Sequence, residues 1–346
     1  MSPRLAALAT AVPPFALDQD RVTAQMRRLF AGSARFERLL PVFANSGIER
    51  RYSAVPLDWF ERPHSWPERN RTYLASALDL LETVAGRLLD RAESSPDEVG
   101  AVVTVSTTGL ATPSLDALLI ERMRLPRDVQ RLPIFGLGCA GGAIGLGKAA
   151  ALARSIPDRA VLLLVVELCT LAFHRDDGGN SDIVAAALFG DGAAGALLRS
   201  RGDGPAILAR GEHTWPASLD VMGWDIVDEG FKAIFSRDIP ALVADGLGAA
   251  ARDFLSRHGL RPGDIDRFVC HPGGPKVIAA CEAALGIPER SLRDARAILR
   301  EFGNMSAPSV LFVLERMMAA GGDWRHALVT ALGPGFTAGF TLLSRE

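Results

Sequence analysis

Three residues of this chain have the types and settings from which acyl-transfer chemistry is built. Cys139 stands in GLGCAGG, where glycines form a tight turn into a helix, His271 follows an apolar run in HPGGPK, and Asn304 precedes a helix in GNMSAPS. A helix N-terminus and a nearby imidazole favour the thiolate of a cysteine, which makes it a nucleophile. Histidine and asparagine side chains that donate to one carbonyl oxygen stabilise an enolate or oxyanion. Together they suit carbon–carbon bond formation on thioesters.

Each of these residues also has a simpler interpretation. A cysteine is often a small buried hydrophobe, His271 would cap its loop, and Asn304 would cap a helix. The glycines from Gly136 to Gly141 also fit the G-x-G-x-x-G fingerprint of a dinucleotide site, with Glu167 at the end of a second strand to bind a ribose. This dehydrogenase hypothesis leaves the settings of His271 and Asn304 unexplained.

Short apolar runs alternate with helical patterns, and these elements must position the three residues. The alternation indicates an α/β protein with buried strands. The N-terminal MSPRLAALATAVPP is interpreted as a buried strand ending at Pro13, in preference to a secretory signal. Further strands are expected over residues 101–105, 160–166, 193–198, 267–270, 327–332 and 339–343. Helices are expected over residues 72–92, 142–154, 239–258, 275–284 and 306–319.

The chain has the pattern of an internal duplication. An acidic turn and an apolar strand occur in SPDEVGAVVTVST and again in RPGDIDRFVCHP; Asp97 precedes Cys139 by 42 residues, and Asp264 precedes Asn304 by 40. We expect an N-terminal half, residues 1–200, with the cysteine and a C-terminal half, residues 201–346, with the histidine and asparagine. A pseudo-two-fold axis would then bring the three residues together, unless the similarity is a coincidence of α/β units.

Composition excludes several classes of function. Lysine and arginine number 38 against 40 acidic residues, so the net charge of −2 offers no basic surplus for nucleic acid. The four cysteines are widely spread without a C-x-x-C pair, which argues against disulfides and a metal site. No apolar run reaches the roughly 18 residues of a membrane span. We therefore expect a cytoplasmic protein without a transmembrane segment.

Five motifs together resemble one family. GLGCAGG, ALFGDGAAG, HPGGP, GNMSAPSVLFVLE and LGPGF have the order and spacing of the chalcone-synthase-like type III polyketide synthases, over nearly the whole chain. The resemblance implies a duplicated thiolase fold, layered αβαβα, and a homodimer. It implies an acyltransferase that repeats the decarboxylative Claisen condensation of malonyl-CoA onto an acyl-CoA starter. Loss of carbon dioxide drives each condensation, so coenzyme A thioesters suffice and no redox cofactor or metal is implied.

The resemblance also implies roles for individual residues. Cys139 would hold the starter and the growing chain, while His271 and Asn304 would bind the malonyl carbonyl and assist decarboxylation. Backbone N–H groups of the LGPGF loop, with that of Cys139, would polarise the acyl carbonyl. Thr112 would lie near the dimer interface and reach toward the partner's cavity, unless it is only a turn residue. The implied substrate pocket comprises Thr112, Phe189, Phe231, Ala233, Gly273, Gly274, Gly333, Pro334, Gly335 and Phe336.

The basic residues that hold the coenzyme A phosphates in plant members are only partly kept. Arg38 lines up with one of them, while Pro41 and Asn45 replace two others. Candidates to replace them are Arg50, Arg51 and Lys276, although solvated charge or a structural ion pair would explain the two arginines equally well.

Two stretches, residues 106–117 and 222–240, resemble the bacterial long-chain alkylpyrone and alkylresorcinol synthases. Ala233 stands where plant enzymes carry a phenylalanine, which would leave room for an acyl tail, although Phe231 would fill the space after a shift of two residues. The nearest alternative is an initiating ketoacyl-acyl-carrier-protein synthase, which shares the cysteine, histidine and asparagine. Such enzymes have an HQAN-like sequence at the histidine, where this chain has HPGGP.

Overall fold

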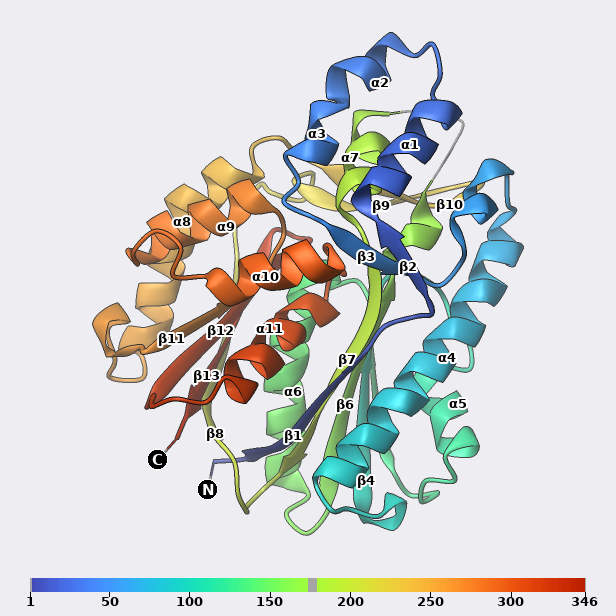
Figure 1. Cartoon of the computed structure of the whole chain (residues 1–346). Coiled ribbons are helices and arrows are strands. Elements are labelled where there is room, and N and C mark those ends of the chain that lie inside the picture. The colour runs from blue at the N-terminus through green and yellow to red at the C-terminus, as the bar shows by residue number, and fades with distance from the viewer. Residues whose placement is uncertain (1, 174–178, 346) are drawn as a thin grey trace.

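Strands from both parts of the chain join in one nine-stranded sheet with the order β11-β12-β13-β8-β1-β7-β6-β4-β5 (Figure 1). The computed structural model describes residues 2–173 and 179–345. One half-sheet is formed by β1 (Arg4–Ala11), β4 (Val99–Val105), β5 (Gln130–Ile134), β6 (Ala160–Leu168) and β7 (Asp191–Arg199). The other is formed by β8 (Ala206–Thr214), β11 (Arg267–Cys270), β12 (His326–Gly333) and β13 (Thr337–Ser344). The two half-sheets meet between β1 and β8, where Arg4 pairs with Ala206.

Helices form three layers around the half-sheets. Between the half-sheets lie α6 (Gly141–Ser155) and α11 (Pro308–Ala319), which contact each other and strands on both sides. The outer layers include α4 (Trp66–Arg91) and α5 (Leu115–Arg122) on one side, and α8 (Ile239–Ser256) and α9 (Pro275–Leu285) on the other. The order of layers is therefore αβαβα, which confirms the expected thiolase architecture.

The remaining elements lie around the end of the sheet where the site is found. They comprise β2 (Phe15–Asp18), α1 (Gln19–Leu29), α2 (Ala34–Leu39), α3 (Pro41–Ala44), β3 (Arg50–Ser53), α7 (Asn180–Leu188), β9 (Met222–Val227), β10 (Gly230–Phe235) and α10 (Arg293–Phe302). Single 3-10 turns occur at Leu57–Glu61, Pro96–Glu98, Gly138–Ala140, Cys169–Ala172 and Pro262–Asp264.

The two half-sheets repeat one topology. β4 is parallel to β6, which is antiparallel to β7, and in the second half β11 is parallel to β12, which is antiparallel to β13. The central helices α6 and α11 occupy equivalent places in this order. This repeat agrees with the expected duplication. The proposed division at residue 200 falls between β7 and β8, and it stays a prediction.

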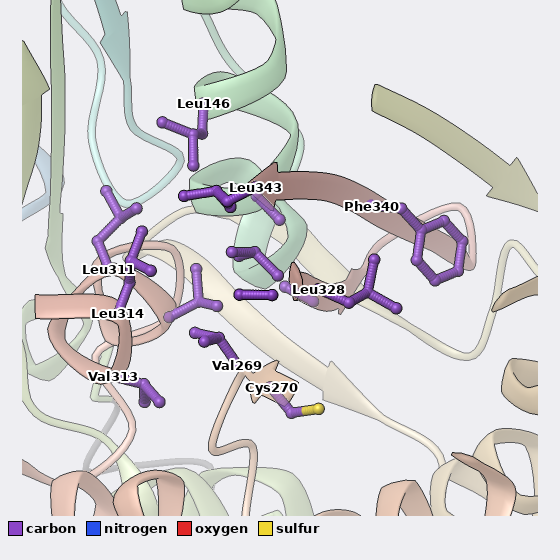
Figure 2. Packing of buried hydrophobic residues seen from close by; sticks show 14 of the residues in the cluster. Leu146, Val269, Cys270, Leu311, Val313, Leu314, Leu328, Phe340 and Leu343 are labelled. Atoms are coloured by element: carbon purple, nitrogen blue, oxygen red, sulfur yellow. The ribbon is translucent and has the colours of Figure 1, made fainter. Parts of the chain in front are cut away.

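Burial on both faces explains the continuous apolar strands. Every residue of β4 and β6 is buried, because α4 covers one face of the half-sheet and α6 the other. Leu146 of α6 and Leu311 of α11 belong to the same cluster as Val269, Leu328 and other strand residues (Figure 2). The central helices are thus held by apolar packing on all sides, and their N-terminal ends are fixed in space.

Glycine allows α6 and the start of α11 to approach closely. A Cβ atom on Gly142 would lie 2.3 Å from the backbone oxygen of Ala307. No side chain fits in that space, so the helix beginning after Cys139 and the segment following Asn304 are in direct contact. The crossing of these two segments places two of the expected catalytic residues at one point.

Candidate active site

Cys139 lies in a single 3-10 turn, Gly138–Ala140, between β5 and α6. Gly136 and Gly138 have positive φ angles of 89° and 45°, which glycine adopts without strain. The loop after β12 packs against this turn: a Cβ atom on Gly138 would lie 2.7 Å from Pro334, and one on Gly333 would lie 2.3 Å from the oxygen of Leu137. The glycines therefore serve close packing around the cysteine.

His271 follows β11 and is held by its backbone, whose N–H donates to the oxygen of Thr330 at 3.0 Å. Its side chain is buried, with 5% of the residue exposed, yet neither Nδ1 nor Nε2 has a hydrogen-bond partner among the described residues. Burial lowers the pKa of His271 to about 3, so the imidazole is neutral. A buried ring with both nitrogens unpartnered is suited to a ligand that supplies the missing partners.

Asn304 is held by hydrogen bonds on all sides. Its backbone N–H donates to Leu188 at 2.8 Å, and its backbone oxygen accepts from Gly190 at 3.0 Å. Side-chain Nδ2 donates to the oxygen of Gly273 at 3.2 Å, and Oδ1 accepts from the N–H of Ser306 at 2.8 Å. An amide nitrogen carries two hydrogens, so Nδ2 has a second one available for substrate.

The three residues line one cavity of about 450 Å³. Its walls come from α3, α7, β10, the starts of α8 and α9, and the loops that hold the three residues. Phe189, Gly273, Gly274 and Lys276, which the sequence also singled out, line the same cavity. The structure therefore brings together residues that lie more than a hundred positions apart in the chain.

The protonation state of Cys139 differs from the expectation. Burial raises the pKa of its thiol to about 11, although the Ser306 hydroxyl, 3.4 Å from Sγ, acts in the opposite direction. The predicted preference for the thiolate is wrong for the unliganded protein, because loss of hydration at the buried sulfur outweighs the effect of the helix start. The thiol and the His271 imidazole are both neutral.

Other predicted pocket residues lie behind the cavity wall. Gly333 and Pro334 support the cysteine turn, as described above. The backbone N–H of Phe336 donates to Ser218 Oγ at 2.9 Å, and the same hydroxyl donates to the oxygen of Gly335 at 3.3 Å. The Phe336 ring is fully buried, 5.3 Å from the ring of Trp215. These residues position the site without lining the cavity that holds Cys139.

Ala233 lines a second, apolar cavity of about 40 Å³. Phe189 belongs to both cavities and forms the wall between them, and Trp224 and Cys169 complete the surroundings of Ala233. Phe231 lies elsewhere: its ring is 5.0 Å from that of Trp66, and it lines neither cavity. Its ring also lies 6.2 Å from that of Trp224, so Phe231 is next to the surroundings of Ala233 without lining the cavity. This placement favours Ala233 as the counterpart of the plant phenylalanine, and the assignment stays a prediction.

The predicted arginines do not reach the main cavity. Arg50 pairs with Asp18 at 3.4 Å on the surface, and Arg38 is exposed outside the lining. Arg51 is buried and donates to the backbone oxygens of Ala186, Ala187 and Phe189. The structural interpretation holds for Arg51. Of the four candidates only Lys276 lines this cavity, and a phosphate role for Arg38 stays a prediction. Thr112 lies on an exposed loop between β4 and α5.

Sequence reasoning missed Ser306, and it gave Glu167 a role at a ribose only in the dehydrogenase alternative. Glu167 is fully buried and accepts hydrogen bonds from the backbone N–H groups of Thr107 and Thr108 and from the Thr108 hydroxyl. These bonds occupy the carboxylate, so it has no place for a ribose hydroxyl. Thr107 also accepts from the N–H of Gly138 at 3.2 Å, which links this buried group to the cysteine turn.

Neither a metal-binding cluster nor a membrane-spanning helix is found among the described residues. They hold no cluster of three or more histidine, cysteine, aspartate or glutamate side chains suited to a metal ion. Within residues 2–173 and 179–345, no helix has both the length and the apolar character needed to cross a bilayer.

A cysteine, a histidine and an asparagine around one cavity of a duplicated αβαβα fold define a condensing enzyme of the thiolase superfamily. Comparison of the sequence with models of known protein families identifies the family. Residues 4–202 match the N-terminal domain of chalcone and stilbene synthases, and residues 207–345 match their C-terminal domain. The chain belongs to this family, the type III polyketide synthases, which are acyltransferases that carry out decarboxylative Claisen condensation on coenzyme A thioesters.

Individual relatives cover nearly the whole chain. It is 37% identical to a putative chalcone synthase of Bacillus subtilis over 98% of each chain. It is 39% identical to the 1,3,6,8-tetrahydroxynaphthalene synthase of Streptomyces peucetius subsp. caesius, over 98% of this chain and 92% of the relative. The crystal structure of the Streptomyces coelicolor tetrahydroxynaphthalene synthase superposes with a TM-score of 0.94 at 28% identity, over 99% of both chains. These matches exclude the dehydrogenase and ketoacyl synthase alternatives.

Proposed function

We propose that this enzyme condenses malonyl-CoA with a long-chain acyl-CoA starter held on Cys139 and releases an alkylpyrone or alkylresorcinol. The observation that carries the proposal is the cavity shared by Cys139, His271 and Asn304, with the apolar cavity of Ala233 beyond Phe189. The main cavity of about 450 Å³, whose lining is largely apolar, would hold most of the acyl tail, and the small cavity beyond Phe189 adds about 40 Å³. A Mycobacterium tuberculosis relative, 29% identical over 95% of this chain, is named for alpha-pyrone synthesis.

The first step loads the starter. The sulfur of Cys139 attacks the acyl-CoA carbonyl carbon, the bond from that carbon to the coenzyme A sulfur breaks, and the thiol proton passes through His271 to the leaving sulfur. A neutral imidazole with a free lone pair is suited to this transfer. Free coenzyme A leaves with the proton.

The second step makes the carbon nucleophile. Malonyl-CoA places its thioester oxygen near His271 and the second hydrogen of Asn304 Nδ2. The bond to the carboxylate breaks, carbon dioxide leaves, and the electron pair becomes the enolate that these donors stabilise. The enolate carbon attacks the acyl carbonyl on Cys139 and displaces the sulfur, so the lengthened chain is on coenzyme A until it returns to Cys139.

We also propose a homodimer formed at the free edge of β5. Phe135, which directly follows β5, is 56% exposed, and Leu110, in the loop after β4, is 45% exposed. An unpaired strand edge with exposed apolar side chains is suited to pairing with a second copy. The exposed Thr112 loop lies beside this surface, in agreement with its expected reach toward the partner. By light scattering, wild type should have the mass of a dimer and Phe135→Asp the mass of a monomer. A wild-type protein with the mass of a monomer would contradict the proposal.

Product analysis tests the substrate class. Purified enzyme is incubated with ¹³C-malonyl-CoA and acyl-CoA starters from acetyl to palmitoyl, and the products are identified by mass spectrometry. We expect pyrones or resorcinols that retain the unlabelled alkyl chain of long starters. Fully labelled aromatic products formed from malonyl-CoA alone would overturn the proposed starter while leaving the family chemistry intact.

A further inference from the structure

The open end of the main cavity carries an uneven distribution of charge. Four of its lining residues are exposed and therefore mark the mouth: Pro41, Asn45, Arg237 and Lys276. The first two come from α3 and the turn after it, and both are uncharged. The other two are cations at the starts of α8 and α9. No acidic residue occurs among the described residues that line this cavity.

Arg237 and Lys276 have no charged partner among the described residues, in contrast to Arg50, which pairs with Asp18. The neighbour of Arg237, Asp238, is engaged locally: its N–H donates to Ser236 Oγ at 3.1 Å, and its carboxylate accepts from the same hydroxyl at 3.3 Å. The two cations are therefore available to an anionic ligand at the mouth.

Backbone groups add to the positive potential on the same wall. Arg237 directly precedes the N-cap of the 18-residue helix α8, and Lys276 is the second residue of the 11-residue helix α9. The N-terminal end of a helix carries partial positive charge and favours anions. Deeper in the cavity, the buried His271 ring with two unpartnered nitrogens independently indicates that a ligand enters here.

We propose that Arg237 and Lys276 bind the phosphates of the coenzyme A thioester from the wall formed by the starts of α8 and α9. The inference rests on the proposed function, in which such thioesters are substrates. The N-terminal part of the mouth offers Pro41 and Asn45 in place of cations, so the attachment of the phosphates lies on the C-terminal part of the chain. Arg237 is the main positioning residue, because a planar guanidinium matches two phosphate oxygens at once.

Steady-state kinetics with two thioesters test this role. Arg237→Gln, Lys276→Gln and the double variant are compared with wild type on malonyl-CoA and on malonyl-pantetheine, which lacks the phosphates. A hydrogen bond to a charged group corresponds to an affinity change of about 10- to 100-fold. We expect the double variant to raise KM for malonyl-CoA by about that factor, with kcat unchanged and with unchanged KM for malonyl-pantetheine.

Two controls keep the outcome specific. Arg50→Gln removes an exposed arginine that does not line the cavity and should leave both KM values unchanged. Increasing salt should raise the wild-type KM for malonyl-CoA and should have little effect on the double variant, since charges at an exposed mouth are screened.

The proposal is overturned if the double variant keeps the wild-type KM for malonyl-CoA, or if KM rises equally for malonyl-pantetheine. It is also overturned if Arg50→Gln produces the larger change. Wild type that forms no product from either thioester would refute the proposed function instead. In that case the affinity for free coenzyme A, measured by calorimetry, still tests the phosphate site. An affinity at least tenfold lower in the double variant than in wild type supports the site, and equal affinities overturn it.

Discussion

The side-chain oxygen of Asn304 accepts a hydrogen bond from the backbone N–H of Ser306 at 2.8 Å. This contact fixes the orientation of the Asn304 amide, because Oδ1 must face the N–H donor of Ser306. Nδ2 then faces Gly273 in the histidine loop, with one hydrogen bonded and one available. The side-chain hydroxyl of Ser306 lies 3.4 Å from the Cys139 sulfur, so this one residue contacts two catalytic side chains.

We predict that Asn304→Asp abolishes malonyl-CoA decarboxylation. The replacement has nearly the same shape but places an oxygen where the substrate needs an N–H donor. Removal of one such donor costs about 100- to 1,000-fold in rate. Carbon dioxide release from ¹⁴C-malonyl-CoA measures this step directly. Starter loading on Cys139 serves as the control and should persist, whereas decarboxylation at the wild-type rate would refute the assigned role.

The raised pKa of Cys139 predicts slow alkylation at neutral pH. Only the thiolate reacts with iodoacetamide, and the thiol pKa of about 11 lies above that of a free cysteine. The rate should therefore rise about tenfold per pH unit and show no plateau below pH 10. Intact-protein mass spectrometry follows the reaction, with Cys139→Ala as the background for the three buried cysteines. A plateau near neutral pH would instead indicate a thiolate–imidazolium pair.

Gly142 and Gly86 should respond in opposite ways to alanine. In an open helix position alanine gains up to about 1 kcal/mol of stability over glycine, and a Cβ at Gly86 in α4 meets nothing within 4 Å. At Gly142 the Cβ would lie 2.3 Å from the Ala307 oxygen, so we expect a loss of about 1–3 kcal/mol through forced separation of the two segments. Urea denaturation measures both; stabilisation by Gly142→Ala would contradict the close crossing.

We predict that Ala233→Phe shortens the starters that the enzyme accepts. Ala233 is buried beside Phe189 and Trp224 at the small apolar cavity, and a phenyl ring would fill that space. Turnover of palmitoyl-CoA should fall about tenfold while turnover of acetyl-CoA is retained. The lost space corresponds to one or two methylenes, and each buried methylene contributes about 0.8 kcal/mol. Phe231→Leu, outside both cavities, is the matched control. Equal loss for all starters would show a general packing defect.

The buried parts of the fold are those that sequence predicts well. All six expected later strands and all five expected helices are present, since continuous apolar runs and helical periodicity follow directly from burial. Strand β5 was missed because its residues are half-buried or exposed and include Pro133. The β9–β10 hairpin was missed because its alternation is weak and its two strands pair with each other outside the nine-stranded sheet.

At the site, sequence predicted the residues whose motifs surround them and missed those defined by geometry. Cys139, His271 and Asn304 stand in glycine- and proline-rich loops that signal a special backbone. Ser306 and Arg237 have ordinary local sequence. The contact with Cys139 shows the place of Ser306, and the cavity lining shows that of Arg237. The protonation of Cys139 was also beyond reach. The residue is half-buried, and its pKa depends on how far the surrounding turn and the Ser306 segment remove the sulfur from water.

Intact-protein mass spectrometry of the acyl-enzyme tests the central claim most directly. Enzyme incubated with palmitoyl-CoA, without malonyl-CoA, should gain the mass of one palmitoyl group. After proteolysis, that group should be found on the peptide that contains Cys139. Added malonyl-CoA should discharge it, and Cys139→Ala should gain no mass. An unchanged adduct in Cys139→Ala, or a wild-type adduct that malonyl-CoA cannot discharge, would contradict Cys139 as the residue that carries the growing chain.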